Sequence, residues 1–172
     1  KLTEDAQHVL SDIRKDIEGI ERHRGDLLEA ARSALSKNRF VEIRGDGGTG
    51  KSALLRHLAE EVSRESAVLV FAANRTIGGG WAALSSRLDL KRPCKELLVE
   101  VAATGGATIF IDGMDRFSEA QQATVRDILR SAVDVPSLRA LASARNDFGV
   151  DGSGWLHQDI SDAFGGRRRV PI

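Results

Sequence analysis

Residues 45–52 of the chain read Gly45-Asp46-Gly47-Gly48-Thr49-Gly50-Lys51-Ser52. They fill every fixed position of the pattern G-x-x-x-x-G-K-[ST]. The short apolar segment before them, residues 40–43, predicts a strand. The segment that they open, residues 51–66, carries apolar residues at helical spacing and predicts a helix. A glycine-rich turn from strand to helix indicates an α/β protein.

These eight residues, called the phosphate loop below, predict a polyphosphate site. Several backbone N–H groups must converge on a polyphosphate, and so tight a loop needs glycines, which fill four of its eight positions. The helix that follows directs its N-terminal N–H groups and positive dipole end at the same phosphates. We expect Lys51 to bridge the outer two phosphates and the Ser52 hydroxyl to bind Mg²⁺. The alternative is a glycine-rich turn without a ligand.

Two acidic residues follow another predicted strand. Residues 107–111 are suited to a buried strand, and Asp112 stands at its carboxyl end, where open α/β sheets bind ligands. Asp112 is therefore expected to orient the shell of the metal ion. Asp115 lies three residues further on and could orient and deprotonate a water beside the γ-phosphate. The alternative for Asp115 is a charge at a helix start or in a surface turn.

An arginine follows a third predicted strand. Residues 138–143 predict the strand, and Arg145 lies just beyond it. In a sheet where this strand lies between the phosphate loop and the Asp112 strand, Arg145 could sense the γ-phosphate. The alternative is an exposed arginine paired with Asp147.

Helical and strand patterns alternate along the whole chain, with no internal repeat. Further helices are predicted over residues 3–19, 26–37, 81–88, 95–103, 118–132 and 155–164, and further strands over 67–73 and 169–172. Ser118 and Gln121 form a capping-box signature. Such alternation favours a parallel sheet covered by helices on both faces. We predict a helical extension over residues 1–37 and an α/β core over residues 38–172.

The composition is that of one soluble globular domain: 172 residues, 41% hydrophobic and 29% charged. Its 25 Lys and Arg balance 25 Asp and Glu, so no net charge draws the chain to nucleic acid or an anionic membrane. The longest apolar run, residues 67–73, is much shorter than the roughly 20 residues of a membrane span. The single cysteine, Cys94, forms no intrachain disulfide. We expect a cytoplasmic protein with no membrane partner, and a piece of a longer chain that opens on Lys1.

Three segments together resemble a known family. GDGGTGKS at 45–52, TIFIDGMD at 108–115 and LRALASAR at 138–145 resemble the phosphate loop, acid-bearing strand and sensor arginine of the STAND NTPases. These proteins are relatives of the AAA+ ATPases and act as signalling switches. The resemblance covers residues 20–146. It implies a P-loop NTPase fold, a three-layer α/β/α sandwich whose five parallel strands have the order 5-1-4-3-2. It also implies that Asp112 holds Mg²⁺, that Asp115 is the catalytic acid or base, and that Arg145 senses the γ-phosphate.

The chain departs from the family pattern in two places. Arg116 stands where the family usually has a glutamate after its second acid. Ile20-Glu21-Arg22 lacks the glycine of the segment that often lies near the adenine. The family's helical lid or winged helix, and its ligand-sensing repeats, would lie beyond Ile172.

The resemblance implies an ATP-binding switch that hydrolyses ATP slowly, uses Mg²⁺, and acts on other domains of the same longer chain or in a homo-oligomer. Two alternatives stay open. One is a small-molecule or nucleotide kinase with Arg167-Arg168-Arg169 in a lid, and the other is a DNA-loading AAA+ ATPase that binds DNA phosphates with the same run. The even charge balance makes nucleic acid the less expected partner. ATP is expected over GTP because the chain has no guanine-reading Asn-Lys-x-Asp segment.

Overall fold

The computed structural model describes residues 21–149 and 154–172. The helix predicted over residues 3–19 lies outside them, and the side chains of residues 21–24 are not described either.

A sheet of five parallel strands forms the centre of the molecule. The strands are β1 (Phe40–Arg44), β2 (Ala67–Ala72), β3 (Ala107–Asp112), β4 (Leu138–Ala144) and β5 (Arg168–Pro171). They lie in the order β2-β3-β4-β1-β5. This is the predicted order 5-1-4-3-2 viewed from the other edge, so the fold prediction is confirmed. Every residue of β1 and β3 is buried, as expected for inner strands covered on both faces.

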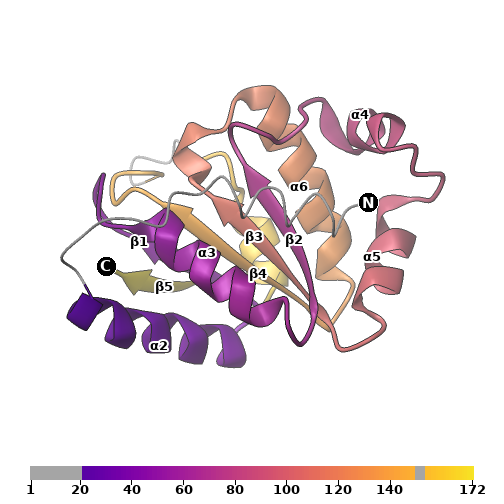
Figure 1. Cartoon of the computed structure of the whole chain (residues 1–172). Helices are drawn as coiled ribbons and strands as arrows, with labels where there is room; N and C mark the ends of the chain where they lie inside the picture. Colours follow the sequence, from indigo (N-terminus) through magenta and orange to yellow (C-terminus); the bar gives the residue numbers. More distant parts are fainter. Residues whose placement is uncertain (1–20, 150–153) are drawn as a thin grey trace.

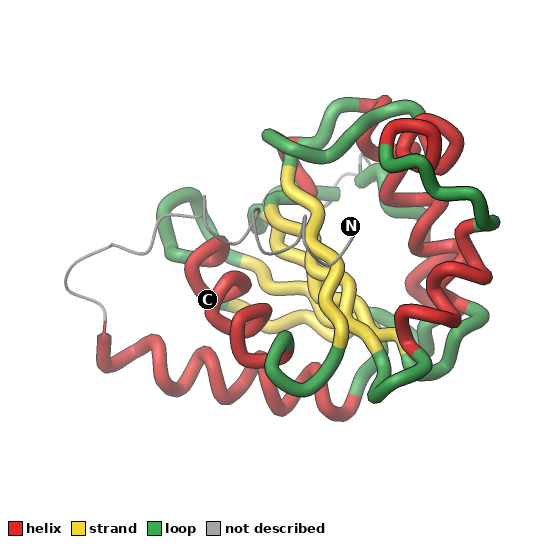
Figure 2. The backbone as a smooth tube through the Cα atoms, turned by 45° about the vertical axis from the view of Figure 1, so that its right-hand side comes forward, coloured by secondary structure: helices red, strands yellow, loops and turns green. Residues whose placement is uncertain are grey.

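Helices cover both faces of this sheet (Figures 1 and 2). The helices α2 (Glu21–Lys37) and α3 (Lys51–Val62) pack on one face. The other face carries α4 (Gly80–Arg87), α5 (Cys94–Ala102), α6 (Glu119–Val133) and α7 (Gln158–Ala163). A short 3₁₀ helix, η1 (Met114–Arg116), follows β3 directly. None of the helices in the described part of the chain has the length and hydrophobicity that crossing a membrane requires.

The sheet separates two apolar cores. Strand alternation sends Val41 and Ile43 of β1 into the core beneath α2 and α3, whereas Phe40 joins the core beneath α6 and α7. Glu42 and Arg44 therefore also lie on the α7 side, although both are polar and buried. Beside the phosphate loop, the face of the sheet that α6 and α7 cover therefore carries two buried charged side chains, Glu42 and Arg44.

Some element boundaries near the C-terminal end differ from the sequence prediction. A helix is predicted over residues 155–164, but α7 spans only Gln158–Ala163. Trp155 is fixed instead by a tertiary contact, because its indole N–H donates a hydrogen bond to the carbonyl of Met114 at 2.7 Å. By contrast, the capping box of Ser118 and Gln121 begins α6 where the sequence places it.

Candidate functional site

The phosphate loop connects the end of β1 to the start of α3. Gly45 allows the close approach of two segments, because a Cβ there would lie 2.6 Å from the Ile172 carbonyl oxygen and 2.8 Å from the Thr49 hydroxyl oxygen. Gly50 has a φ of 86° immediately before α3, in the left-handed region that favours glycine. Gly47 and Gly48 lie between them, where a Cβ would meet nothing within 4 Å. The loop can therefore turn sharply without side chains filling the space around its middle.

The N-terminus of α3 is open to an anion. No side chain caps the helix, and its first turn contains no acidic residue. The first-turn N–H groups of a helix have no intrahelical partners, and the helix dipole adds positive potential at this end. The loop and helix thus fit a phosphate group, which would take these donors.

Lys51 lies among the charged groups of the site. Its Nζ atom donates hydrogen bonds to the carbonyl oxygens of Gly45 at 2.7 Å and Asp46 at 2.6 Å, so the side chain folds back over the loop. Burial lowers the pKa of the Lys51 ammonium, and the positive charges of Arg145 and Arg116 act in the same direction. The carboxylates of Asp115 and Asp46 oppose them and raise this pKa. An anionic ligand would offset the burial of the ammonium and replace the carbonyl contacts.

Asp112 is held by hydroxyl groups from two different elements. Its Oδ1 atom accepts a hydrogen bond from the Ser52 hydroxyl at 2.8 Å and another from the Ser143 hydroxyl at 2.9 Å. The Ser143 oxygen in turn accepts the N–H of Gly113 at 2.8 Å. The carboxyl ends of β3 and β4 and the start of α3 therefore meet at one carboxylate.

This oxygen set fits Mg²⁺, which takes one or two protein oxygens and completes its shell with water and substrate phosphates. Ser52 and Asp112 would be the protein groups that hold it. The described residues contain no group of three or more His, Cys, Asp or Glu that could hold a metal by itself. A metal here would therefore depend on the nucleotide for further ligands.

Asp115 and Arg145 form an ion pair that also lies close to the carboxyl ends of β3 and β4. The Arg145 Nε atom lies 3.3 Å from Asp115 Oδ2, and the Arg145 backbone N–H donates to Asp115 Oδ1, also at 3.3 Å. The Asp115 side chain is 15% exposed and that of Arg145 is 58% exposed. The structure thus pairs Arg145 with Asp115, where the sequence left pairing with Asp147 open.

Three contributors to the site were not assigned a role from the sequence. Ser143 supports Asp112, and Arg116 Nη2 donates to the other oxygen of the same carboxylate, Oδ2, at 3.3 Å. Asn146 Nδ2 donates to Asp46 Oδ1 at 2.9 Å and so joins the loop after β4 to the phosphate loop. The sequence does offer a signal for Ser143, because it is a polar residue near the end of a segment that is predicted to be a buried strand. Asn146 and Arg116 carried no such signal, since exposed polar residues are common after strands.

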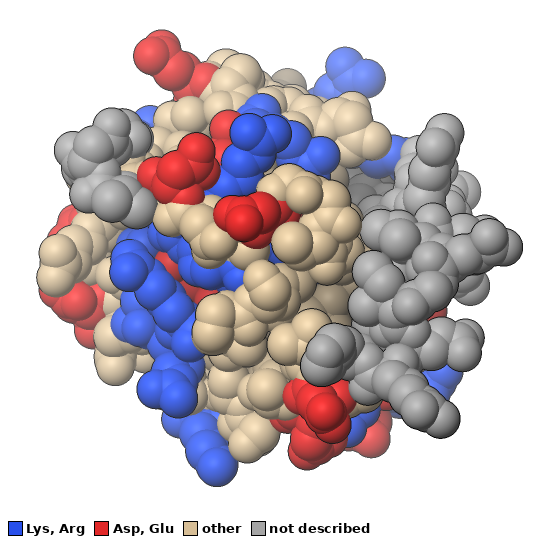
Figure 3. Space-filling model, turned by 90° about the vertical axis from the view of Figure 1, so that its left-hand side faces the viewer, with Lys and Arg blue, Asp and Glu red and all other residues tan. Residues whose placement is uncertain are grey.

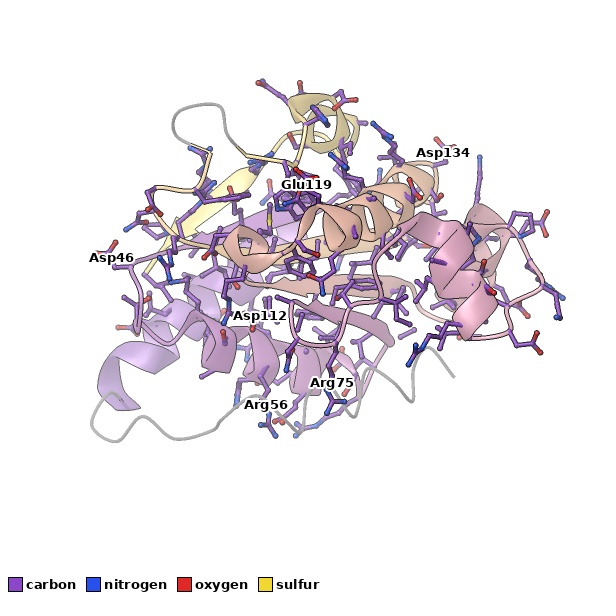
Figure 4. All side chains as sticks on the ribbon, turned by 90° about the horizontal axis from the view of Figure 1, so that it is seen from above. Asp46, Arg56, Arg75, Asp112, Glu119 and Asp134 are labelled. Carbon is purple, nitrogen blue, oxygen red and sulfur yellow. The ribbon has the colours of Figure 1, made fainter. Side chains whose placement is uncertain are left out.

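The residues that the sequence predicts for the site therefore lie together at the carboxyl ends of β1, β3 and β4. Viewed from above, Asp46 projects from the phosphate loop at one end of the molecule, and Asp112 lies further in (Figure 4). The arginines of residues 167–169 do not join them. Arg167 and Arg169 instead lie within 3.6 Å of the buried carboxylate of Glu42 on β1.

Comparison with known proteins identifies the fold. No protein-family profile and no curated protein sequence matches this chain. Solved structures do match, at low sequence identity. A replication initiator DnaA bound to AMPPCP and single-stranded DNA has a TM-score of 0.57 and 19% identity, over 95% of this chain and 49% of that one. Cdc6p from Pyrobaculum aerophilum has a TM-score of 0.54 and 15% identity, over 95% of this chain and 48% of its own.

A third structure, of Drosophila ORC bound to AT-rich DNA and Cdc6, has a TM-score of 0.51 and 16% identity, over 88% of this chain and 57% of that one. This chain thus spans about half the length of the proteins it resembles. Identities this low concern the fold alone. The described residues share with these structures a three-layer α/β fold built on a five-stranded parallel sheet, the architecture predicted as the P-loop NTPase fold.

Proposed function

We propose that this chain is the ATP-binding domain of a larger STAND-type signalling ATPase, a nucleotide switch that hydrolyses ATP slowly with Mg²⁺. The observation that carries the proposal is the hydrogen bond between Ser52 and Asp112 at 2.8 Å. It brings a hydroxyl and a carboxylate together beside the open N-terminus of α3. Phosphates and a hard divalent cation need these groups in one place.

Each residue has a role in this proposal. The backbone of the phosphate loop, Gly45 to Ser52, surrounds the phosphates, and Lys51 neutralises the outer two. Ser52 and Asp112 hold Mg²⁺, which would supply charge neutralisation when bound. Asp115 orients the attacking water, and Arg145 reports the presence of the γ-phosphate.

The Asp115–Arg145 ion pair supports a switch rather than a fast hydrolase. A γ-phosphate bound at the proposed site would compete with Asp115, which lies 3.3 Å from Arg145 Nε, because both anions attract the Arg145 guanidinium. Release of Asp115 would free a carboxylate to accept a proton from water. ATP and ADP would thus favour different arrangements of β4 and η1, and other domains of the same chain, or a second copy, could respond to that difference. We also propose a cytoplasmic location, consistent with one cysteine and no disulfide.

The decisive test is binding of Mg-ATP to a Lys51→Ala variant, measured by isothermal titration calorimetry. Loss of the ammonium removes a charge-assisted contact worth about 1.5–3 kcal/mol, so affinity should fall at least about tenfold. Lys91→Ala is the matched control, because the Lys91 side chain is 83% exposed and pairs only with Asp89 among the described residues. Unchanged affinity in Lys51→Ala would reject the phosphate-loop assignment. A competition in which GTP displaces ATP would reject the choice of nucleotide.

A DNA-loading ATPase is the second candidate, favoured by the fold likeness to DnaA and ORC, whose structures contain DNA. Such a domain would bind single-stranded DNA through phosphate contacts, with an affinity that falls steeply as salt rises. Fluorescence anisotropy with a labelled oligonucleotide at several salt concentrations separates the candidates. Salt-dependent binding in the presence of Mg-ATP favours the DNA-loading role, and its absence favours the switch.

A further inference from the structure

A separate pocket lies on the α7 side of the sheet, between β1, β5, α7 and the loop that follows β4. Its volume is about 670 Å³, within the roughly 300–1,000 Å³ of typical small-molecule sites. The lining includes Arg44, Phe148, Leu156, Ser161, Arg167 and Arg169, and none of residues 45–52. The pocket is therefore distinct from the phosphate loop.

A buried carboxylate, Glu42, pairs with three of the arginines that line this pocket. Glu42 is fully buried, and Arg44 Nη2 donates to its Oε1 atom at 2.9 Å. Two more arginines approach its Oε2 atom, Arg169 Nε at 3.4 Å and Arg167 Nη1 at 3.6 Å. One cation suffices to balance one buried carboxylate, so the cluster holds more positive charge than Glu42 requires.

The charge surplus remains when the whole lining is considered. The charged side chains of the lining residues are four arginines and Asp162, with Glu42 beneath and His157 at the side. Since strand alternation directs the Arg168 side chain to the opposite face, three positive charges against two carboxylates leave the pocket cationic. Basic side chains also gather in a band on the molecular face drawn in Figure 3.

The Arg44 side chain has a donor group without a hydrogen-bond partner in the described part of the chain, which independently indicates a ligand. Its side chain is 8% exposed, and its Nη1 atom donates to the carbonyl oxygens of Arg145 and Phe148. Its Nε atom is buried and has no hydrogen-bond partner among the described residues. A buried, unpaired donor on a charged group is costly, so such groups usually have a function or an absent partner.

We propose that this pocket binds the phosphate group of a small phosphorylated ligand. Guanidinium groups match phosphate oxygens with two parallel hydrogen bonds, and three arginines face one carboxylate here. A phosphate monoester carries a charge of about −1.5 to −2 at pH 7, which more than offsets this positive surplus. Phe148 and Leu156 provide apolar surface for the rest of the ligand. This site is independent of the proposed ATP site and holds whether or not that site binds ATP.

Strand alternation provides a matched control within the arginine run. Arg169 pairs in register with Glu42, so its side chain lies on the pocket side of the sheet. Arg168 pairs in register with Val41, which packs under α2 and α3 on the opposite face. Arg168 borders the pocket, but its side chain is directed to the other side. Removing either charge changes the net charge equally, and only Arg169 should matter for the ligand.

The test is NMR of the ¹⁵N-labelled chain, which follows the arginine Nε–H signals during titration with inorganic phosphate or with AMP. The titration is made on the Lys51→Ala chain, so that the phosphate loop lacks the ammonium that would bind the added phosphate. We expect the Arg44 and Arg169 signals to shift and saturate. Arg169→Gln should weaken binding about tenfold or more, as for loss of a charge-assisted hydrogen bond, whereas Arg168→Gln should change it less than about twofold.

Each outcome has a clear meaning. Equal affinity for phosphate and AMP identifies the phosphate ion as the ligand, and tighter AMP binding identifies a nucleotide, so both support the site. Unshifted Arg44 and Arg169 signals at millimolar ligand would overturn it, as would equal losses in Arg168→Gln and Arg169→Gln. A single-stranded oligonucleotide that shifts these signals when phosphate does not would replace the small ligand with nucleic acid. Arg169→Gln should fold, because the Arg169 side chain is 64% exposed. Failure of Mg-ATP binding at Lys51 would leave this result unaffected.

Discussion

Asp112 contacts three other polar side chains of the proposed site. One of its oxygens accepts two serine hydroxyls, and the other lies near Arg116. Ser52 is the expected magnesium residue, and Ser143 is a positioning residue that fixes the carboxylate rotamer. Arg116 places a cation against the carboxylate that would hold the metal. The STAND pattern usually has a glutamate at this position, so in the proposed STAND-type site Arg116 places a base where that pattern has an acid, next to Asp115.

Asp115→Asn should preserve ATP binding and slow hydrolysis by about 10²–10⁴-fold, the usual contribution of a general acid or base. The amide keeps the shape of the side chain but cannot accept a proton from water. Single-turnover hydrolysis with bound Mg-ATP measures the effect without a contribution from affinity. Asp134→Asn is the control, because it removes an exposed ion pair, with Lys95 at 2.8 Å, at the opposite end of the molecule from Asp46 (Figure 4). Equal hydrolysis rates in Asp115→Asn and the unaltered chain would remove Asp115 from the mechanism.

At the scale of elements, the start of α6 organises the loop that follows β2. The Gln121 Oε1 atom accepts the N–H of Ser118 at 3.0 Å, as the capping-box signature predicts. Its Nε2 atom also donates to the carbonyl oxygens of Ala73 at 2.6 Å and Thr76 at 2.9 Å. One side chain therefore both caps a helix and satisfies two carbonyl groups of a distant loop.

Gln121→Ala should accordingly destabilise the fold more than loss of a cap alone. We expect a loss of about 1–3 kcal/mol in the free energy of unfolding, because carbonyl groups that lie partly buried lose their donor. The neighbouring Gln122→Ala is the matched control, since Gln122 makes one such bond, to the Phe117 carbonyl at 2.9 Å, and should cost about 1 kcal/mol. Urea denaturation followed by circular dichroism measures both. Equal losses would show that the loop contacts contribute nothing.

The sequence predicted the elements whose signals are local. Turn residues, a capping box and short apolar runs located β1, α3, β3, α6 and β4 close to their observed bounds, and they placed Ser52 near Asp112 through the sheet topology. Contacts between distant segments carry no local signal. The hydrogen bond from the Trp155 indole to Met114 and the Arg145–Asp115 ion pair therefore had to come from the structure. The faces that Arg168 and Arg169 occupy also had to come from the structure, because the register of β5 with β1 decides them.

At the scale of the whole molecule, the question is whether residues 1–37 form a separate extension, as the sequence suggests. In the described part, α2 contributes Ala31, Ala34 and Leu35 to the core shared with α3 and β1. This core lies on one face of the sheet, and the two tryptophans, Trp81 and Trp155, lie with the core on the other face. The two cores share the strands between them.

Leu35→Ala tests that coupling, because tryptophan fluorescence reports on the opposite face. Leu35 is 5% exposed, so truncation should cost about 2–5 kcal/mol through lost burial and a cavity. If α2 belongs to one cooperative unit, the tryptophan-monitored thermal midpoint should fall by several degrees, at about 2–4 °C per kcal/mol for a chain of this size. Val99→Ala, at a side chain on α5 that is 50% exposed, should leave the midpoint within about 1–2 °C. An unchanged tryptophan midpoint in Leu35→Ala, with helical signal lost at lower temperature, would instead make α2 an independent extension.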